Sequence, residues 1–366
     1  MTTLSHDDLK RLLDGATILG SGGGGPKSIG EQFLKYLLKQ PPVSVIDPKE
    51  LTKDQWVAVG AGVGSPLAAA NNFPTDVPKM AFQALDKTLR QQNPPVKLMG
   101  VLPGEIGAGN TFVPLAIASQ LKIPIVDASG ARRAIPSLTQ CTYAHLPISP
   151  IVLANKTTEV SFSADNAAEA EPIMRAIISS GTFTEDAGIA FWNMNGVTVQ
   201  QNAVVNTLTY ALELGKVLYS ALQAKQDPVK AVVKYLKGYI LFKGEIVDTT
   251  ESTEGGFDFG TVVLQDKKKN IMTIYNQNEN LIGWVSNKMH PVAIAPDLIS
   301  YLTTDGITFS NADLGLAQGK EVVVIGSPST AQLRSPAIMP AWTAALTSLG
   351  YAGQYVPIEE IWAKPK

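Results

Sequence analysis

The chain has 366 residues, which is long for a single hydrophobic core, so we expect two domains. Hydrophobic residues make up 45% of it and charged residues only 17%, a balance typical of an enzyme that also buries area between subunits, as a homo-oligomer does. The formal net charge is −2 and no basic tract is present, so nucleic acid is not an expected partner.

Membranes, metals and cofactors are not expected either. No apolar stretch reaches transmembrane length, and the first residues lack the pattern of a secretory signal. The single cysteine, Cys141, excludes an internal disulfide and a cysteine-based zinc cage. His6, His145 and His290 lie far apart and form no helical pair, so each is expected to be structural. These features together predict a cytoplasmic protein.

The first distinctive segment is a glycine run at residues 20–25, where five of six positions are glycine. Helical patterns flank it at residues 9–19 and 27–38, and Pro26 suits the start of the second helix. A glycine backbone lets a ligand approach closely, and the helix N-terminus favours an anion; the alternative is a flexible linker. No strand precedes the run and no Gly-Lys-Ser/Thr ends it, which argues against a nucleotide- or phosphate-dependent enzyme.

Strands and helices then alternate up to Pro150. Strand patterns cover residues 43–46, 56–59, 97–102 and 123–127, and helical patterns cover residues 78–91 and 112–121. This alternation predicts a mainly parallel α/β domain, in which ligands bind beyond the carboxyl ends of the strands. Three loops follow strand ends in this way, at residues 60–66, 103–111 and 127–136.

The pattern changes after this alternating part. We place an α/β domain with glycine-rich loops at residues 1–165 and a C-terminal domain at residues 166–366. The second domain is expected to be helical at residues 169–223. At residues 235–295 strand patterns follow one another without a helix, which predicts a β-rich barrel or sandwich. The tail after residue 330 could pack back on the α/β layer.

Four passages taken together are more specific than any one of them. They are residues 13–24, Gly62-Val63-Gly64-Ser65-Pro66, residues 105–110 and residues 127–136. In this order and spacing they resemble the S-methyl thiohydantoin desulfurase-like family, whose members occur near hydantoinase/oxoprolinase enzymes. Pro296-Asp297-Leu298-Ile299 also resembles a passage of the C-terminal domain of that family, so the likeness covers nearly the whole chain.

Two of these passages depart from the family pattern. The family usually has Gly-Ala before the asparagine where this chain has Ala108-Gly109. The second acid of the family's other passage is Ser129 here, and a glycine is Arg132. This loop therefore gains a positive charge and loses a negative one, which bears on the identity of the substrate.

The resemblance implies an N-terminal α/β domain, a β-rich C-terminal domain and chemistry on a small, five-membered, ureide-like ring. Water replaces a sulfur substituent at a ring carbon flanked by two nitrogens. Such an addition–elimination needs a base for the water, donors for the developing negative charge and an acid for the leaving sulfur. No cofactor is implied, and a hydantoinase/oxoprolinase-type enzyme is the candidate protein partner.

We assign catalytic roles to Glu105, Asp127 and Arg133. Glu105 lies in a glycine-flanked loop after a strand, where a carboxylate can face a pocket, and Asp127 ends a strand. Arg133 matches the family arginine and could bind a carboxylate or a polarised oxygen bidentately. Substrate-binding roles are assigned to Gly22, Gly23, Gly24, Gly64, Ser65, Asn110, Ser129 and Arg132.

Some of these residues have simpler alternative roles. Glu105 could be a surface acid near the N-terminus of the next helix, and Asn110 could be the N-cap of that helix. Cys141 could be a nucleophile that attacks the ring carbon. We favour a buried, inert thiol, because His145 is the one histidine near Cys141 in the sequence and reactive cysteines need an activating environment.

Two functions remain open at this stage. The chain is either a hydrolase-like desulfurase acting on a hydantoin- or thiohydantoin-type ring, or a non-catalytic ligand-binding subunit of a hydantoinase/oxoprolinase-type enzyme. The replacement of the family acid by Ser129 shifts the balance slightly towards the binding subunit. Turnover of S-methyl thiohydantoins by the isolated protein would separate the two.

Overall fold

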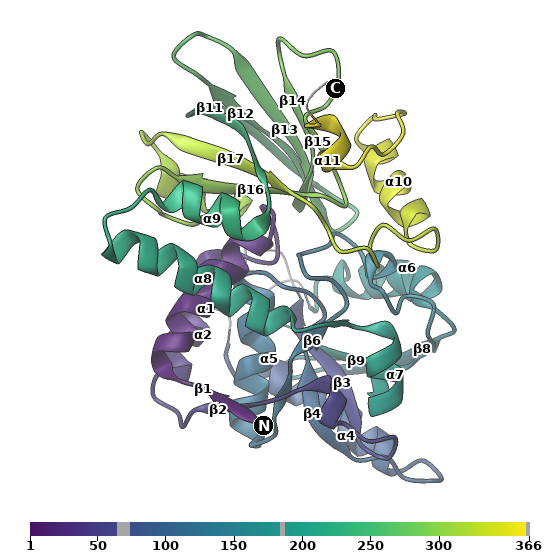
Figure 1. Ribbon diagram of the computed structural model, residues 1–366. Coiled ribbons are helices and arrows are strands. Elements are labelled where there is room, and N and C mark those ends of the chain that lie inside the picture. Colours follow the sequence, from purple (N-terminus) through teal and green to yellow (C-terminus); the bar gives the residue numbers. More distant parts are fainter. Residues whose placement is uncertain (64–73, 184–186, 364–366) are drawn as a thin grey trace.

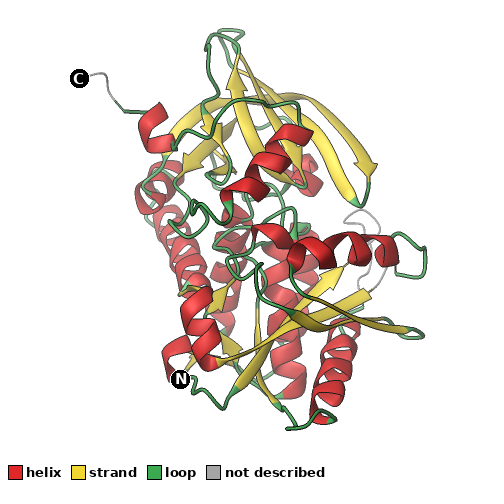
Figure 2. Ribbon diagram, turned by 90° about the vertical axis from the view of Figure 1, so that its right-hand side faces the viewer, coloured by secondary structure: helices red, strands yellow, loops and turns green. Residues whose placement is uncertain are grey.

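The computed structural model describes residues 1–63, 74–183 and 187–363. The chain builds two sheets at opposite ends of the molecule with helices between them (Figures 1 and 2). Within the described residues no helix is both long and apolar enough to cross a membrane. The two-part architecture, α/β followed by a β-rich domain, confirms the fold class predicted from the sequence.

The first sheet has eight strands in the order β1-β2-β5-β4-β3-β9-β7-β8. They are β1 (Thr2–Leu4), β2 (Val43–Ile46), β3 (Trp56–Val63), β4 (Leu98–Leu102), β5 (Ile125–Val126), β7 (Ile148–Ala154), β8 (Glu159–Ala164) and β9 (Ala187–Asn195). Strands β2, β5, β4 and β3 pair in parallel, as the alternating pattern predicts. The pairs on both flanks are antiparallel, so the sheet as a whole is mixed.

Helices pack around this sheet, and the last of them packs on the second sheet instead. They are α1 (His6–Leu19), α2 (Lys27–Leu37), α4 (Val77–Arg90), α5 (Ala108–Leu121), α6 (Ala167–Ile178), α7 (Gly196–Asn202), α8 (Thr207–Gln223) and α9 (Pro228–Leu236), with a short helix η1 (Pro48–Glu50). Ser5 and Asp8 form a reciprocal capping box that starts α1. Helices α1 and α8 cross closely because Gly15 and Gly215 lie at their contact, where an added Cβ would come within 1.8 Å of the facing backbone.

The region predicted to be helical, residues 169–223, contains strand β9 in the structure, and its last helix begins later than the local pattern predicts. Strand β10 (Val204–Val205) pairs with β6 (Ala128–Ser129) as a separate two-stranded ladder. Asn206 then takes a positive φ of 59°, which helices exclude, so α8 starts at Thr207. Long-range pairing therefore overrides the local helical pattern at this point.

The second sheet has seven antiparallel strands in the order β15-β14-β13-β12-β11-β17-β16. They are β11 (Tyr239–Glu254), β12 (Phe257–Gln265), β13 (Ile271–Gln277), β14 (Glu279–Val285), β15 (Ala293–Ile294), β16 (Leu298–Thr303) and β17 (Val322–Ser327). Strand β14 also packs against β16, so the sheet curls into a nearly closed barrel. Residues 255–290 contain strands and turns and no helix, which confirms the predicted β-rich region.

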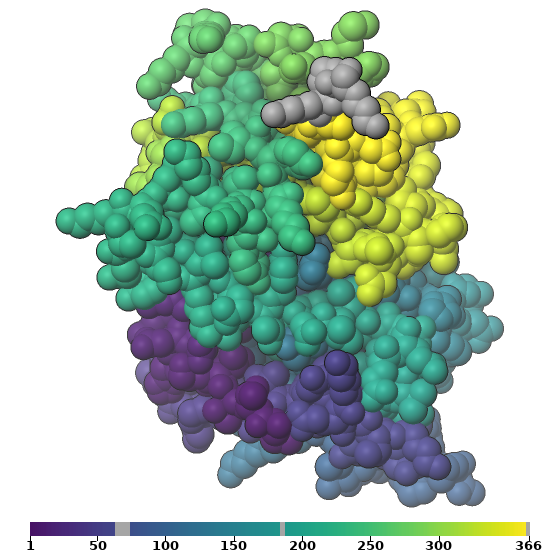
Figure 3. Space-filling view, in the orientation of Figure 1, coloured from purple at the N-terminus to yellow at the C-terminus, as the bar shows by residue number. Residues whose placement is uncertain are grey.

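The C-terminal segment joins the two parts. It contains α10 (Met339–Ser348) and α11 (Ile358–Ile361). Two short helices lie earlier in the chain, η2 (Leu138–Gln140) and η3 (Asn311–Ala317). Helix α10 contacts η2 of the first part, and Ser348 Oγ donates to Gln277 Oε1 of the second at 3.3 Å. The space-filling view shows this yellow segment packed on the side of the molecule where both parts meet (Figure 3).

Candidate active site

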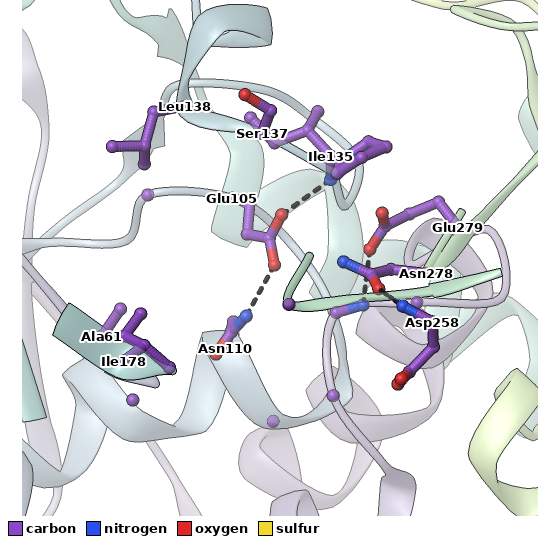
Figure 4. A pocket seen from close by; sticks show the side chains of 18 of the residues that line it. Ala61, Glu105, Asn110, Ile135, Ser137, Leu138, Ile178, Asp258, Asn278 and Glu279 are labelled. Carbon is purple, nitrogen blue, oxygen red and sulfur yellow. Dashed lines mark hydrogen bonds between the residues drawn. The ribbon is translucent and has the colours of Figure 1, made fainter. Parts of the chain in front are cut away.

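A cavity of about 440 Å³ lies where the two parts meet. That volume falls in the range of small-molecule sites. One wall comes from the glycine run, the Glu105 loop, residues 135–138, α6 and β9, and the other from the β11–β12 and β13–β14 hairpins and residues 310–312 (Figure 4). The cavity therefore brings together the glycine run and parts of the three loops that follow strand ends, namely Gly62, the segment from Glu105 to Asn110 and residues 135–136.

The glycine run forms one side of the cavity and touches both domains. An added Cβ at Gly23 would lie 2.0 Å from Glu279 Oε1, and one at Gly24 would lie 2.5 Å from Gly107 Cα. Gly24 also has a φ of 74°, a region that glycine adopts at low cost. The run is thus built for close backbone approach.

The N-terminus of α2, which the sequence singles out as an anion site, already holds an anion from the chain itself. Asp313 Oδ2 accepts a hydrogen bond from the Lys27 amide at 2.6 Å. At α5, the Gly24 carbonyl accepts hydrogen bonds from the amides of Gly109 and Asn110 at 3.0 and 3.1 Å. The N-termini of α2 and α5, which flank the glycine run, are therefore both occupied by acceptor groups of the protein itself.

Glu105 faces the cavity from the loop between β4 and α5. Its Oε1 accepts a hydrogen bond from Asn110 Nδ2 at 2.6 Å, and its Oε2 accepts one from the Ile135 amide at 2.7 Å (Figure 4). Enclosure raises the pKa of Glu105, and the two hydrogen bonds and the charge of Arg133 partly oppose this rise. Helix α5 begins at Ala108, so Asn110 lies within its first turn and its side chain orients Glu105.

Glu279 is the second carboxyl group of the cavity, and the sequence analysis missed it. It follows Asn278, whose φ of 57° makes the tight β13–β14 turn, and it is 2% exposed. Its Oε1 accepts a hydrogen bond from the Gly24 amide at 3.1 Å, whereas Oε2 has no partner among the described residues. Burial and then the charge of Glu105 raise the pKa of Glu279 well above its ordinary value.

The sequence carried only a weak signal for Glu279. Residues 276–280 are five consecutive polar residues, which predict a turn. Hairpin turns are normally solvated, yet Glu279 and its neighbour Asn280 are buried against the first domain. Burial of a polar turn depends on tertiary contacts that a local pattern does not encode.

Arg133 lies behind the two carboxyl groups and does not line the cavity. It is fully buried and donates hydrogen bonds to the carbonyl oxygens of Pro296 and Asp297 at 2.7 and 2.9 Å. Burial lowers its pKa to about 10, against the opposing charge of Glu279, so the guanidinium stays charged at neutral pH. Arg133 therefore acts as a tie between the domains and a counter-charge, and it has no path to a ligand in the cavity.

The other residues predicted from the 127–136 loop also lie outside the cavity. Asp127 accepts hydrogen bonds from the Leu208 and Thr209 amides at the start of α8. Ser129 is buried and donates to the Ala131 carbonyl at 2.6 Å. Arg132 stacks on the ring of Tyr210, with its guanidinium carbon 4.1 Å from the ring centre. Of the other predicted residues, Gly22, Gly23, Gly24 and Asn110 line the cavity, and Gly64 and Ser65 lie outside the described residues.

Cys141 lines the cavity but is poorly suited to act as a nucleophile. Its side chain is buried, with Sγ 3.9 Å from the Gly104 carbonyl oxygen. Burial, and then the charges of Glu105 and Glu171, raise the pKa of this thiol well above its ordinary value. In the part of the chain that the structure describes, no group of three or more His, Cys, Asp or Glu side chains is arranged to hold a metal ion.

An apolar wall completes the cavity on the α/β side. It includes Leu138, Met174, Ile178, Ile189 and Phe191. The adjoining Trp192 takes a positive φ of 45°, which is rare for a bulky side chain and often marks a functional site. The cavity thus combines an apolar wall on the α/β side with carboxyl and amide groups that both domains contribute.

The fold and this cavity define a two-domain protein with a cavity of small-molecule size between an α/β domain and a barrel-like domain. The chain belongs to the S-Me-THD-like family, because the models of its N-terminal and C-terminal domains match residues 7–164 and 164–358. It is also similar to a protein from Chromobacterium violaceum of known crystal structure, at 31% identity over 98% of this chain and 100% of that one, with a TM-score of 0.85. No curated protein matches the chain.

Proposed function

We propose that this protein is a hydrolase that replaces the sulfur substituent of a small thiohydantoin-type ring with oxygen from water. The observation that supports it most is the pair of carboxyl groups, Glu105 and Glu279, which two different domains contribute to one cavity. Pairs of carboxyl groups whose surroundings separate their proton affinities are typical of general acid and base catalysis. Family membership supports the choice of ring.

The surroundings of the two groups suggest which one holds the proton. Glu105 accepts two hydrogen bonds, which stabilise its ionised form, and Arg175 adds a favourable charge. Glu279 accepts one hydrogen bond and has an oxygen without a partner among the described residues, and burial and the charge of Glu105 raise its pKa. We therefore assign Glu105 as the base and Glu279 as the acid.

The reaction follows from these roles. Glu105 takes a proton from water as the water oxygen bonds to the ring carbon between the two nitrogens. The C=N bond becomes a single bond as its nitrogen takes that proton from Glu105. The C–S bond then breaks as the new C–O bond becomes a carbonyl, and Glu279 donates a proton to the leaving thiolate. The second water proton passes from the hydroxyl to a carboxylate, so the products are a thiol and the oxygen-containing ring.

Asn278 is a further candidate for binding the ring. Its Oδ1 accepts a hydrogen bond from the Asp258 amide at 2.8 Å, which fixes the orientation of the side-chain amide. The Nδ2 group consequently points away from Asp258 and into the cavity beside Glu279 (Figure 4). An N–H donor at this place suits a ring oxygen or the negative charge that develops during addition. The apolar wall around Ile178 suits an S-alkyl group.

The experiment is turnover of an S-methyl thiohydantoin by the isolated protein, followed by methanethiol release with a thiol reagent. We expect Glu105→Gln and Glu279→Gln each to lower kcat by about 10²–10⁴-fold, the usual contribution of a general acid or base. Glu31→Gln, an exposed change on α2, serves as the matched control and should keep full activity.

Two outcomes would contradict this proposal. Full activity of either cavity variant would exclude the assigned role of that carboxyl group. Binding of the ring without any turnover would instead favour the non-catalytic subunit of a hydantoinase/oxoprolinase-type enzyme. The single cysteine of the chain also suits the reducing conditions of the cytoplasm, where we propose that the protein acts.

A further inference from the structure

The cavity wall contributed by the second sheet is polar and acidic. Strand pairing sets Thr253 of β11 opposite Asp258 of β12, and Glu251 opposite Gly260. Since side chains alternate along a strand, Glu251, Thr253 and Asp258 share one face, and all three line the cavity. Gly260 has no side chain and separates Glu251 from Asn276 of β13, which also lines the cavity. This part of the wall has no basic residue.

The other charges around the cavity are compensated by protein groups. The Arg133 guanidinium is close enough to Glu105 and Glu279 to affect the proton affinity of each. Arg175, the basic residue of the cavity lining, is paired with Glu171, with Nε 2.9 Å from Oε1. It also donates to the Gly256 carbonyl at 2.6 Å. The positive charges of the site are therefore already used.

Glu251 and Asp258 have no such compensation. Neither forms a salt bridge with a basic side chain within the described residues. Partial burial, and then the charge of Asp258, raise the pKa of Glu251, which shows that the two carboxylates repel each other. Asp258 is 9% exposed, and its Oδ1 accepts a hydrogen bond from Thr253 Oγ1 at 2.7 Å. Two like charges without a basic partner at a cavity wall favour a ligand that carries the opposite charge.

A second, independent feature indicates that the cavity is completed by a ligand. The Glu279 side chain is 2% exposed and lines the cavity, and its Oε2 lacks a hydrogen-bond partner within the described residues. A buried polar atom without a partner costs free energy that a bound molecule can return. The acidic wall thus lies in the same cavity as a buried carboxyl oxygen that lacks a hydrogen-bond partner among the described residues, which a solvated surface does not provide.

We infer that the ring substrate carries a positively charged amine on its side chain and that Glu251 and Asp258 bind this amine. The inference rests on the proposed function, because the ring is placed at Glu105 and Glu279 and its side chain extends towards the β11–β12 hairpin. The same wall would repel a carboxylate on the side chain. The acidic wall therefore acts as a specificity determinant, separate from the groups that carry out the reaction.

The test compares three S-methyl thiohydantoins that differ only in the ring side chain: aminobutyl, pentyl and carboxypropyl. We expect kcat/KM to fall in that order, with the aminobutyl compound at least about tenfold better than the carboxypropyl compound, as charge complementarity in a partly enclosed site allows. Glu251→Gln should reduce the preference for the amine about threefold and Asp258→Asn about tenfold, since Glu251 is the more exposed.

Asp248→Asn is the matched control, because Asp248 lies on the same strand, is exposed and does not line the cavity. Calorimetric binding of the three corresponding hydantoins provides a readout that needs no turnover. Tighter binding of the amine, weakened in Glu251→Gln and weakened further in Asp258→Asn, would support the inference even if no compound is hydrolysed and the proposed function fails. Equal or better use of the carboxypropyl compound, or an unchanged preference in both variants, would overturn the inference while leaving the proposed function intact.

Discussion

Asp127 offers the sharpest test of a structural role against a catalytic one. Its carboxylate is 6% exposed and accepts hydrogen bonds from the Leu208 amide at 2.8 Å, the Thr209 amide at 3.1 Å and Thr209 Oγ1 at 2.5 Å. It therefore caps the 17-residue helix α8 from 81 residues away in the sequence. The negative charge also lies at the positive end of the helix dipole.

The expected cost of removing this cap follows from these contacts. Loss of an N-cap costs about 0.5–2 kcal/mol, and amides left without a partner in a buried place add about 1–3 kcal/mol. Removing the carboxylate also removes the cost of its desolvation, which offsets part of these two losses. We therefore expect Asp127→Ala to lower the free energy of unfolding by about 2–4 kcal/mol. Asp127→Asn keeps one oxygen acceptor and should lose only about 1 kcal/mol.

Urea unfolding followed by circular dichroism measures the first quantity, and thiol release measures kcat. We expect both variants to keep kcat within a factor of about three of the wild-type value at a temperature where they are folded, since Asp127 is not part of the cavity lining. A catalytic aspartate would behave in the opposite way. If Asp127→Asn unfolds at the wild-type urea concentration and loses about 10²-fold or more in kcat, the capping argument is wrong.

Three further predictions concern the cavity itself. Gly23→Ala should lower the free energy of unfolding by about 1–3 kcal/mol in urea titrations and reduce kcat, because the new Cβ would displace Glu279. Gly315→Ala is the control. It has open space around it and should change neither quantity. Because the pKa of Glu279 is raised in the folded state, its contribution to stability is fully present below about 4.3, the pKa of a glutamate in the unfolded chain. This contribution is lost as the pH rises through the pKa of Glu279 in the folded state. Glu279→Gln should therefore gain stability over the wild type as the pH rises above about 4.3, by up to about 1.4 kcal/mol per pH unit until the folded-state pKa is passed, and a pH-independent difference in urea midpoints would contradict the raised pKa. Cys141→Ala should keep most of its methanethiol release, whereas a drop of about 10²-fold or more would make Cys141 the nucleophile.

The elements of the fold that depend on local patterns were predictable. Helix α1 has its apolar residues at helical spacing, and the structure buries Leu9, Leu12, Leu13, Ala16 and Leu19 as that spacing requires. Strand β9 was not predicted, because it joins the first sheet by antiparallel pairing with β3, more than 120 residues earlier in the chain. Such pairing depends on the tertiary arrangement and leaves only a weak local signal.

The candidate site was predictable only in part, for a related reason. Glu105 and Asn110 were found because a polar residue among glycines at a strand end rarely serves packing alone. Asp127 follows a strand in the same way, yet its partner is the start of a helix that lies far along the chain. Glu279 could not be found locally, because its burial comes from a domain contact. A polar residue at a strand end thus indicates a loop with a specific role. Whether that role is in the cavity or in capping a helix depends on the group that the side chain contacts.

The domain contact also explains why the glycine run is needed. The Gly24 amide donates to Glu279 Oε1, and the carbonyl oxygens of Ser21 and Gly22 accept hydrogen bonds from the Asn280 and Asn311 amides, each at 2.7 Å. These bonds hold the carboxyl group of the second domain in the buried contact where its pKa rises. A change that loosened the contact would admit water, return the pKa towards its ordinary value and leave an ionised group that cannot donate a proton. The proposed acid is therefore a property of the assembled domains, and neither domain alone would be expected to catalyse the reaction.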